Sequence, residues 1–301
     1  MRLTVLVPAY NEEASISQVI HDMPHTFPGI SAVSVVVVDD GSTDATVSCA
    51  RQSGAHVLVH PEHRGLAAAF RTGCAYALKN GADLIATLDA DGQYVPAELS
   101  LLLQTLRTEK VSLVVGDRQI RKLKHMPLGN WVGNIVGSAM LRVLRLTDMH
   151  DASSGFRMFT RAFAQRLDIT GEHTYTHEML IQATAARVRT AEIPVTFLPR
   201  LHGNSKLIRS VRQHIFRSCG TILRSVFLYH PLPKFLLLSI CCFSGALMFL
   251  AIAATKAFPL SLLLASGVFV MLGIQFVVTG LLADAQAAAR RVRANDSSNA
   301  V

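Results

Sequence analysis

Acidic residues are missing from one long stretch of this 301-residue chain. None occurs between Glu192 and Asp284, although the chain has 21 in all. The net charge of +8 is therefore unevenly spread along the sequence. A basic block of this kind favours a membrane surface or phosphate groups over a diffuse nucleic-acid patch. No nucleic-acid partner is expected.

Cysteine is also scarce, and two nucleotide-binding motifs are absent. The five cysteines, Cys49, Cys74, Cys219, Cys241 and Cys242, show no Cys-x-x-Cys spacing, so neither a disulfide framework nor a zinc site is indicated. No Gly-x-Gly-x-x-Gly follows the first apolar run, and no P-loop occurs anywhere. These absences argue against an NAD enzyme and a P-loop ATPase.

Long uncharged runs occur only near the C-terminus. Residues 235–255 and 260–283 carry no charged residue, and each has roughly the 20-residue length that crosses a bilayer. The intervening KAFP reads as a tight turn, so we predict a transmembrane helical hairpin; a buried soluble hairpin is the alternative.

Charge and the amino-terminal sequence predict the orientation of this hairpin. The start, MRLTVLVPAYNEE, lacks the cationic region, apolar core and cleavage site of a secretory signal. Basic residues crowd before the first span and follow the second as Arg290, Arg291 and Arg293, whereas the turn has only Lys256. We therefore expect an integral membrane protein with its large amino-terminal domain and both termini in the cytoplasm.

Residues 205–232 are expected to form an amphipathic juxtamembrane helix. Its apolar residues recur every three or four positions and its arginines fall largely elsewhere, as in helices that lie in the membrane interface. A core helix with a solvated basic face is the alternative. The expected organisation is a domain over 1–204, this helix, a hairpin over 233–285 and a basic tail over 286–301, whose last dozen residues look disordered.

Short apolar runs alternate with helix-like stretches in the first half of the chain. The runs, rich in Val, Ile and Leu, are 3–7, 33–38, 56–59, 84–88 and 112–115. Continuous apolar strands are buried on both faces, so the pattern predicts an α/β fold with a doubly wound, mainly parallel sheet. Asn11 and either Ser42 or Thr43 are plausible helix N-caps.

Three polar clusters follow strands of this predicted sheet: PAYNE (8–12), DDGSTD (39–44) and DADGQ (89–93). In such sheets ligands bind beyond the carboxyl ends of the strands. Asp89 and Asp91, with Gln93, offer hard oxygen ligands for Mg²⁺ or Mn²⁺, which commonly share few protein ligands with substrate phosphates. A solvated turn is the simpler reading of Asp-x-Asp. A calcium loop is excluded because Gly92 occupies its fourth position, not its sixth.

Together with SGFR (154–157) and RLHGNSK (200–206), these clusters occur in the order seen in glycosyltransferase family 2. The chain resembles the polyprenyl-phosphate branch of that family over roughly residues 3–235. The resemblance implies a GT-A-like domain that inverts the configuration of a hexose, mannose or glucose, on moving it from GDP-mannose or UDP-glucose to a polyprenyl phosphate. It also implies Mg²⁺ or Mn²⁺ as cofactor, contact with membrane lipids and, most simply, a bacterial inner membrane. A homo-oligomer is left open.

The resemblance assigns roles to individual residues. The nucleotide-binding set is Pro8, Tyr10, Glu12, Asp40, Asp89, Ala90 and Ser205. The metal-binding set is Asp89, Asp91 and Gln93. The catalytic set, which includes the phosphate-binding cations, is Asp91, Arg118, Asp151, Arg200 and Lys206. Glu178 is expected to face the sugar, and Arg157 to brace its loop.

Two places depart from the family pattern. His63 and Arg64 stand where Asn and Lys are common, and the segment 126–134 lacks an Arg that some members have. Chemistry supports the same acceptor, because a phosphate monoester, with a second pKa of about 6, is already a nucleophile and needs no strong general base. The rivals are a processive polysaccharide synthase, which needs a Gln-x-x-Arg-Trp motif that the only tryptophan, Trp131, does not form, and a non-catalytic nucleotide-sugar sensor.

Overall fold

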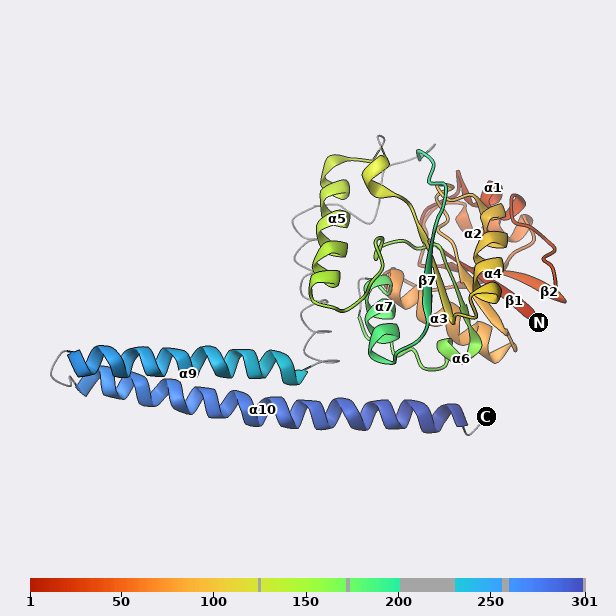
Figure 1. The fold of residues 1–301 in the computed structure, drawn as a ribbon. Coiled ribbons are helices and arrows are strands. Elements are labelled where there is room, and N and C mark those ends of the chain that lie inside the picture. Colours follow the sequence, from red (N-terminus) through yellow and green to blue (C-terminus); the bar gives the residue numbers. More distant parts are fainter. Residues whose placement is uncertain (124–125, 172–173, 201–230, 256–259, 300–301) are drawn as a thin grey trace. The chain divides into compact units, whose positions relative to one another are not determined.

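The computed structural model describes residues 1–123, 126–171, 174–200, 231–255 and 260–299, with the side chains of the last helix described to Ala287 (Figure 1). The chain divides into two compact units, Met1–Ile222 and Leu223–Val301, and each is described by itself. Most of the predicted juxtamembrane helix, with Ser205, Lys206 and Cys219, lies outside the described residues.

The first unit contains a seven-stranded sheet. Its strands are β1 (Arg2–Ala9), β2 (Ala32–Asp39), β3 (His56–Val59), β4 (Leu84–Thr87), β5 (Leu113–Asp117), β6 (Arg157–Thr160) and β7 (Thr190–Pro194), in the order β3-β2-β1-β4-β6-β5-β7. Only β6 is antiparallel to its neighbours, β4 and β5. The other six strands therefore end at the same edge, which we call the rim.

Helices cover both faces of the sheet (Figure 1). They are α1 (Ile16–His21), α2 (Thr46–Gln52), α3 (Leu66–Lys79), α4 (Leu99–Thr108), α5 (Leu128–Val143), α6 (Arg161–Ala164) and α7 (Thr176–Ala185), with short 3-10 helices at Pro96–Glu98 and Ile120–Lys122. The apolar residues of α1 and α4 join one face of β1 and β4 in a buried core. Gly73 of α3 lies against Leu6 and Val38 on the opposite face, where a Cβ would come within 3.0 Å of a side chain.

The five strands predicted from the apolar runs are confirmed, but β6 and β7 were not predicted. The N-cap predictions were wrong, because these polar side chains join two loops. The Asn11 side-chain oxygen accepts from the Thr43 backbone N–H at 2.7 Å, and Asn11 itself has a φ of 54°. Helix α1 begins only at Ile16, and the carboxylate of Asp44 accepts from the Thr46 N–H at the start of α2. The β1 and β2 loops are thereby tied into one wall of the rim.

The second unit contains α9 (Pro231–Thr255) and α10 (Leu260–Asn299). Both are long and apolar enough to cross a membrane, over Pro231–Thr255 and Leu260–Ala287. They pack on each other through small residues: Ser239 donates to the Gly273 carbonyl at 2.9 Å and Ser266 donates to the Ala246 carbonyl at 3.0 Å. The two helices thus form a hairpin of membrane-spanning length, and its insertion in a membrane stays a prediction. Helix α10 runs to Asn299, so it includes most of the tail that we expected to be disordered.

Candidate active site

The loop after β4 carries both carboxylates of the Asp-x-Asp motif. Asp89 is packed against Gly155, where an added Cβ would lie 2.5 Å from a carboxylate oxygen of Asp89. Gly155 lies just before β6, and its carbonyl accepts from the Thr87 hydroxyl at 2.6 Å. The antiparallel strand therefore brings the SGFR segment directly beside the motif, and only glycine fits at that contact.

The pKa of Asp89 is raised well above its usual range. Burial is the largest cause and the neighbouring Asp91 carboxylate is the second, while Arg118 and Arg200 among the surrounding arginines oppose them. The Asp-x-Asp motif therefore brings two carboxyl groups together at one point of the rim. Such a pair of hard oxygen donors favours a divalent cation.

Asp91 is also paired with the predicted phosphate ligand Arg200. The guanidinium of Arg200 lies 2.8 Å from a carboxylate oxygen of Asp91 and 3.4 Å from one of Glu12. The Gln93 backbone N–H donates to Asp91 at 3.1 Å, and its side-chain amide donates to the Leu198 carbonyl at 3.0 Å. The structure thus brings together four predicted residues, from three separate loops.

The residues at this point fit a metal that shares its ligands with a substrate. Within the described part of the chain, no group of three or more His, Cys, Asp or Glu side chains could hold an ion by itself. Asp91 and Asp89 would therefore supply few ligands, and phosphate oxygens would have to supply others. The amide nitrogen of Gln93 is engaged with Leu198, so only its oxygen could join them.

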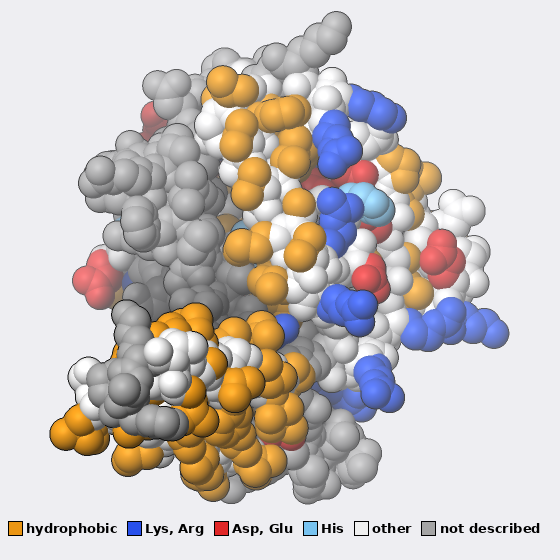
Figure 2. Space-filling model, turned by 60° about the vertical axis from the view of Figure 1, so that its left-hand side comes forward, with side chains coloured by type: hydrophobic (Ala, Val, Ile, Leu, Met, Phe, Trp, Pro, Cys, Tyr) orange, Lys and Arg blue, Asp and Glu red, His pale blue; other side chains and the backbone are white. Residues whose placement is uncertain are grey.

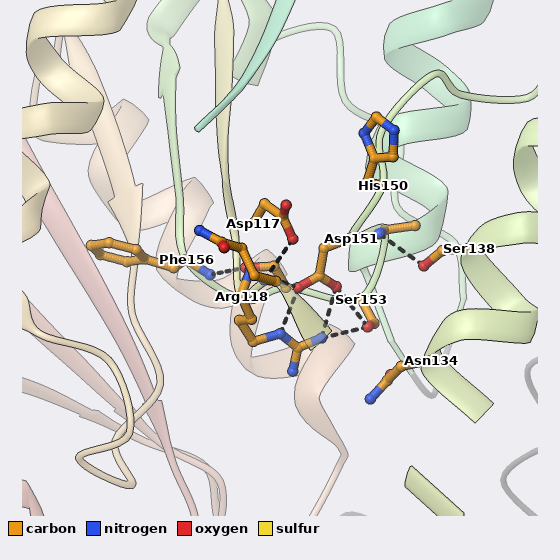
Figure 3. Close-up of polar contacts among 12 residues, drawn as sticks. Asp117, Arg118, Asn134, Ser138, His150, Asp151, Ser153 and Phe156 are labelled. Atoms are coloured by element: carbon orange, nitrogen blue, oxygen red, sulfur yellow. Dashed lines mark hydrogen bonds and ion pairs between the residues drawn. The ribbon is translucent and has the colours of Figure 1, made fainter. Parts of the chain in front are cut away.

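Arg118 and Asp151 form a buried bidentate ion pair (Figure 3). Arg118 Nε and Nη2 donate to the two carboxylate oxygens at 2.7 and 2.8 Å, and Nη2 also donates to Ser153 Oγ at 2.6 Å. Their side chains are 10% and 1% exposed. Burial raises the pKa of Asp151, but the attraction to Arg118 outweighs it and holds this pKa below the usual range. Asp151 is consequently ionised and fully engaged.

Two residues that were not predicted hold the Asp151 segment in place. The carboxylate of Glu192, the middle residue of β7, accepts from the backbone N–H groups of His150 and Asp151 at 2.8 and 2.7 Å. Ser138 of α5 accepts from the Ala152 N–H at 3.1 Å (Figure 3). No local motif marks Glu192 or Ser138, because both act through contacts between distant segments.

The nucleotide-binding residues that were predicted line the β1 and β2 side of the rim. The Tyr10 ring lies 4.2 Å from the ring of His63, measured between centroids. The Asp40 carboxylate is buried and has three hydrogen-bond partners: the His60 ring at 2.8 Å and the backbone N–H groups of Arg64 and Gly65 at 3.0 and 2.7 Å. The His63 ring nitrogen also lies 2.9 Å from one of its oxygens. In the structure, Asp40 thus anchors the start of α3.

The neighbouring Asp39 has an oxygen that is still open. Its Oδ2 accepts from the Ser42 N–H at 3.1 Å, whereas Oδ1 is buried with no hydrogen-bond donor among the described residues. A buried carboxylate oxygen without a donor is costly unless a ligand supplies one. The sequence alone does not show which of the two adjacent aspartates, Asp39 or Asp40, has a carboxylate oxygen without a protein partner in the described part of the chain.

The remaining predicted residues have structural partners. Pro8 lies near the end of β1. The carbonyl of Ala90 accepts from Ser15 Oγ at 2.8 Å. Glu178 is buried and accepts from the backbone of Thr170 and Gly171, so in the structure its carboxylate holds a loop. Arg157 is also buried and donates to the carbonyls of Ala152, Ser154 and Thr176, which is the bracing role expected for it.

Comparison with known proteins places this chain in a family. The Glycosyl transferase family 2 model matches residues 4–168. Polyprenol monophosphomannose synthase of Mycolicibacterium smegmatis is 28% identical over 229 residues, covering 72% of this chain and 85% of that protein. Undecaprenyl-phosphate mannosyltransferase of Micrococcus luteus is 28% identical over 218 residues, covering 69% and 88%.

A solved structure supports the fold. Glucosyl-3-phosphoglycerate synthase of Mycobacterium tuberculosis, in complex with Mn²⁺, UDP-glucose and phosphoglyceric acid, superposes with a TM-score of 0.56. It is 25% identical, and the match covers 73% of this chain and 80% of that one. The predicted GT-A-like, doubly wound and mainly parallel sheet is confirmed by the strand order and by this likeness.

Proposed function

Since this chain belongs to glycosyltransferase family 2, we propose that it transfers a hexose from a nucleoside-diphosphate donor to a polyprenyl phosphate. The observation that carries the proposal is the combination, in one chain, of a rim of carboxylates and arginines with two helices of membrane-spanning length. The names of the two bacterial relatives, both of which act on polyprenyl phosphates, support the acceptor.

The rim would bind the donor through residues from separate loops. Tyr10 and the open oxygen of Asp39 suit the base, because a carboxylate can accept from a ring N–H. Asp40 is better placed to support this wall than to contact the base, because its acceptors are occupied. Asp91 and Asp89 would hold Mg²⁺ or Mn²⁺, which would neutralise charge on the departing diphosphate. The superposed synthase binds Mn²⁺ together with UDP-glucose, which supports a divalent metal ion at the rim. This likeness does not decide between Mg²⁺ and Mn²⁺.

The cations of the rim would position the acceptor phosphate and keep its charge balanced. Arg118 is locked by Asp151, so its guanidinium is fixed before any ligand arrives. Asp151 is too strongly paired to accept a proton, which suits an acceptor that is already ionised. In-line attack of the phosphate oxygen on the anomeric carbon would break the bond to the diphosphate and invert the configuration. Arg200 stays cationic beside Asp91, and Lys206 is predicted to assist.

We propose the same cellular arrangement as the charge pattern predicts. The hairpin would cross the inner membrane of a bacterium, with the catalytic domain and both termini in the cytoplasm. Ser205 and Lys206 would belong to the site, and the basic segment that contains them would lie at the membrane surface. The donor sugar is mannose or glucose.

The test is transfer of labelled sugar by the purified full-length chain in lipid nanodiscs. GDP-mannose and UDP-glucose are each supplied with undecaprenyl phosphate and Mg²⁺ or Mn²⁺, and Asp91→Ala serves as the inactive control. The expected product is organic-soluble, carries one sugar per phosphate and is acid-labile. Donor binding without any lipid-soluble sugar would favour the sensor, and a water-soluble polymer would favour the processive synthase.

A further inference from the structure

Glu192 is the middle residue of β7, a strand at one edge of the sheet, and its carboxylate holds a single loop. Its Oε1 accepts from the backbone N–H groups of His150 and Asp151 at 2.9 and 2.7 Å. Its Oε2 accepts from the His150 N–H at 2.8 Å and lies 2.9 Å from Nδ1 of the His150 ring. The Glu192 side chain is 12% exposed, so water competes little for these charge-assisted hydrogen bonds. Glu192 therefore fixes the backbone that carries the Asp151 side chain.

The sheet connects this contact to Arg118. Strand β7 pairs in parallel with β5, and Glu192 lies opposite Val115 in that pairing. Arg118 follows the last residue of β5, and its guanidinium is bonded to the Asp151 carboxylate. The two strands, the loop at Asp151 and the Arg118 side chain thus form a closed ring of contacts. Both members of the ion pair are tied to the same pair of strands, so the direction of the guanidinium depends on Glu192.

One nitrogen of the Arg118 guanidinium remains available to a ligand. Nε and Nη2 donate to Asp151 and Ser153, and Cζ lies 5.2 Å from the centre of the Phe197 ring. Nη1 makes no hydrogen bond to any residue that the structure describes, and Figure 3 shows it pointing away from Asp151. Its N–H groups can therefore donate to a phosphate. Figure 2 shows Lys and Arg side chains gathered on one face of the molecule, which favours the approach of an anion.

We propose that Glu192 is a positioning residue for the acceptor phosphate, because it sets the direction of Arg118 Nη1 through the backbone at Asp151. The inference rests on the proposed function, in which Arg118 binds that phosphate. Asp151 already balances the charge of the guanidinium in a bidentate pair. What Glu192 contributes is consequently the position of its Oε1, and not its negative charge.

Two conservative variants separate the position of this oxygen from the charge. Glu192→Gln removes the charge but can keep a carbonyl oxygen in the place of Oε1, within reach of both backbone N–H groups. Glu192→Asp keeps the charge but shortens the side chain by one C–C bond, about 1.5 Å, which stretches contacts of 2.7 and 2.9 Å beyond hydrogen-bond length. We therefore expect the Gln variant to behave like wild type and the Asp variant to be defective.

The measurement is calorimetric binding of farnesyl phosphate, a short prenyl phosphate, to the full-length chain in detergent. Glu192→Asp should weaken this binding at least about tenfold, as expected when a charged hydrogen bond is lost. Glu192→Gln should weaken it less than about threefold, because a neutral acceptor still holds the loop. Binding of GDP or UDP with Mn²⁺ should change less than about twofold in either variant, because the loops after β1, β2 and β4 have no hydrogen bond or ion pair with Glu192 among the described residues.

Asp83→Ala is the matched control. The Asp83 carboxylate also accepts a backbone N–H, that of Arg2 at 2.7 Å, but at the end of the strands opposite the rim. Its removal should leave both affinities unchanged. Hydrogen exchange of the peptide 150–156, followed by mass spectrometry without any ligand, should be faster in Glu192→Asp than in wild type, Glu192→Gln and Asp83→Ala. Thermal unfolding, followed by circular dichroism, checks that each variant is folded.

The proposal is wrong if folded Glu192→Asp binds farnesyl phosphate as tightly as wild type, or if Glu192→Gln is as weak as Glu192→Asp, which would assign the effect to charge. It is also wrong if Glu192→Asp loses farnesyl phosphate and nucleotide by the same factor, because Glu192 would then support the domain in general. Rapid exchange of the peptide 150–156 in wild type would contradict it without any variant, and so would wild type that binds no farnesyl phosphate. If wild type binds farnesyl phosphate but forms no lipid-linked sugar, the proposed transfer fails, while the affinities still decide the role of Glu192.

Discussion

Removing the carboxylate of Asp151 tests the buried ion pair on which our reading of the acceptor depends. Asp151→Ala deletes the acceptor of four contacts: Arg118 Nε, Nη2 and backbone N–H, and the Ser153 hydroxyl. The guanidinium of Arg118 stays buried, with Ser153 as its remaining side-chain hydrogen-bond partner among the described residues. A buried charge is thereby left largely uncompensated.

The expected loss of stability is large. Breaking a buried ion pair by removing one partner costs roughly 3–5 kcal/mol in the free energy of unfolding. For a unit the size of Met1–Ile222, the melting temperature should fall by roughly 6–20 °C, at about 2–4 °C for each kcal/mol. Asp151→Asn keeps the shape and one acceptor, so its loss should be smaller, about 1.5–3 kcal/mol. The double variant Arg118→Met/Asp151→Leu removes both charges and should recover much of the difference.

Thermal unfolding of the detergent-purified chain, followed by circular dichroism, measures these losses. Asp22→Ala is the control, because Asp22 is exposed and holds a side-chain contact to Gln18 at 2.7 Å. It should change stability by no more than about 0.5 kcal/mol. A melting temperature of Asp151→Ala equal to that of the control would refute the buried-pair argument. Recovery of transfer by Asp151→Asn at higher pH would show that Asp151 acts as a general base after all.

Three further predictions follow from the rim. Asp91→Ala should abolish transfer and Mn²⁺-dependent binding of nucleoside diphosphate, measured by calorimetry, while the far-ultraviolet dichroism stays unchanged; normal transfer would exclude Asp91 as a metal ligand. Gly155→Ala should reduce transfer severely, because the new methyl would lie 2.5 Å from an Asp89 oxygen, whereas Ala at the open position Gly133 should have little effect. The pKa of Asp151 is lowered by folding, so its stabilisation is present above the unfolded pKa of about 3.9 and is lost as pH falls through the folded value. Denaturant titrations should therefore show wild type, and not Asp151→Asn, losing this stability below about pH 4.

The strand-end clusters were predictable because they depend on local pattern. Runs such as 33–38 are continuous and apolar, and a parallel sheet places polar residues that follow such runs at one edge. The structure places the loops after β1, β2 and β4 at that edge, as expected. The parallel part of the fold could thus be predicted without any long-range information.

The strands β6 and β7 were missed for a physical reason. Arg157–Thr160 has four residues and begins with a buried arginine, and Thr190–Pro194 includes Glu192 and ends in proline. Neither segment has the apolar run that marks the central strands. Both owe their conformation to pairing with β4 and β5, which the local sequence does not specify.

The partners of the predicted site residues could not be read from spacing either. Arg118 is 33 residues from Asp151, and Arg200 is 109 residues from Asp91. Both arginines were predicted as phosphate ligands, and the structure shows each paired with a carboxylate. Whether an arginine meets a ligand or a protein carboxylate depends on tertiary contacts alone.

The two arginine pairs differ in a way that bears on how the rim can bind phosphates. Arg118 and Asp151 are held by two parallel hydrogen bonds and are almost fully buried, so their charges cancel within a rigid unit. The side chains of Arg200 and Asp91 are 17% and 16% exposed and are joined through one nitrogen, so water weakens their attraction. Exchanging partners therefore costs much less at Arg200 than at Arg118. A phosphate arriving at the rim should meet a fixed guanidinium on one side, which sets its position, and an exchangeable one on the other, which supplies the counter-charge.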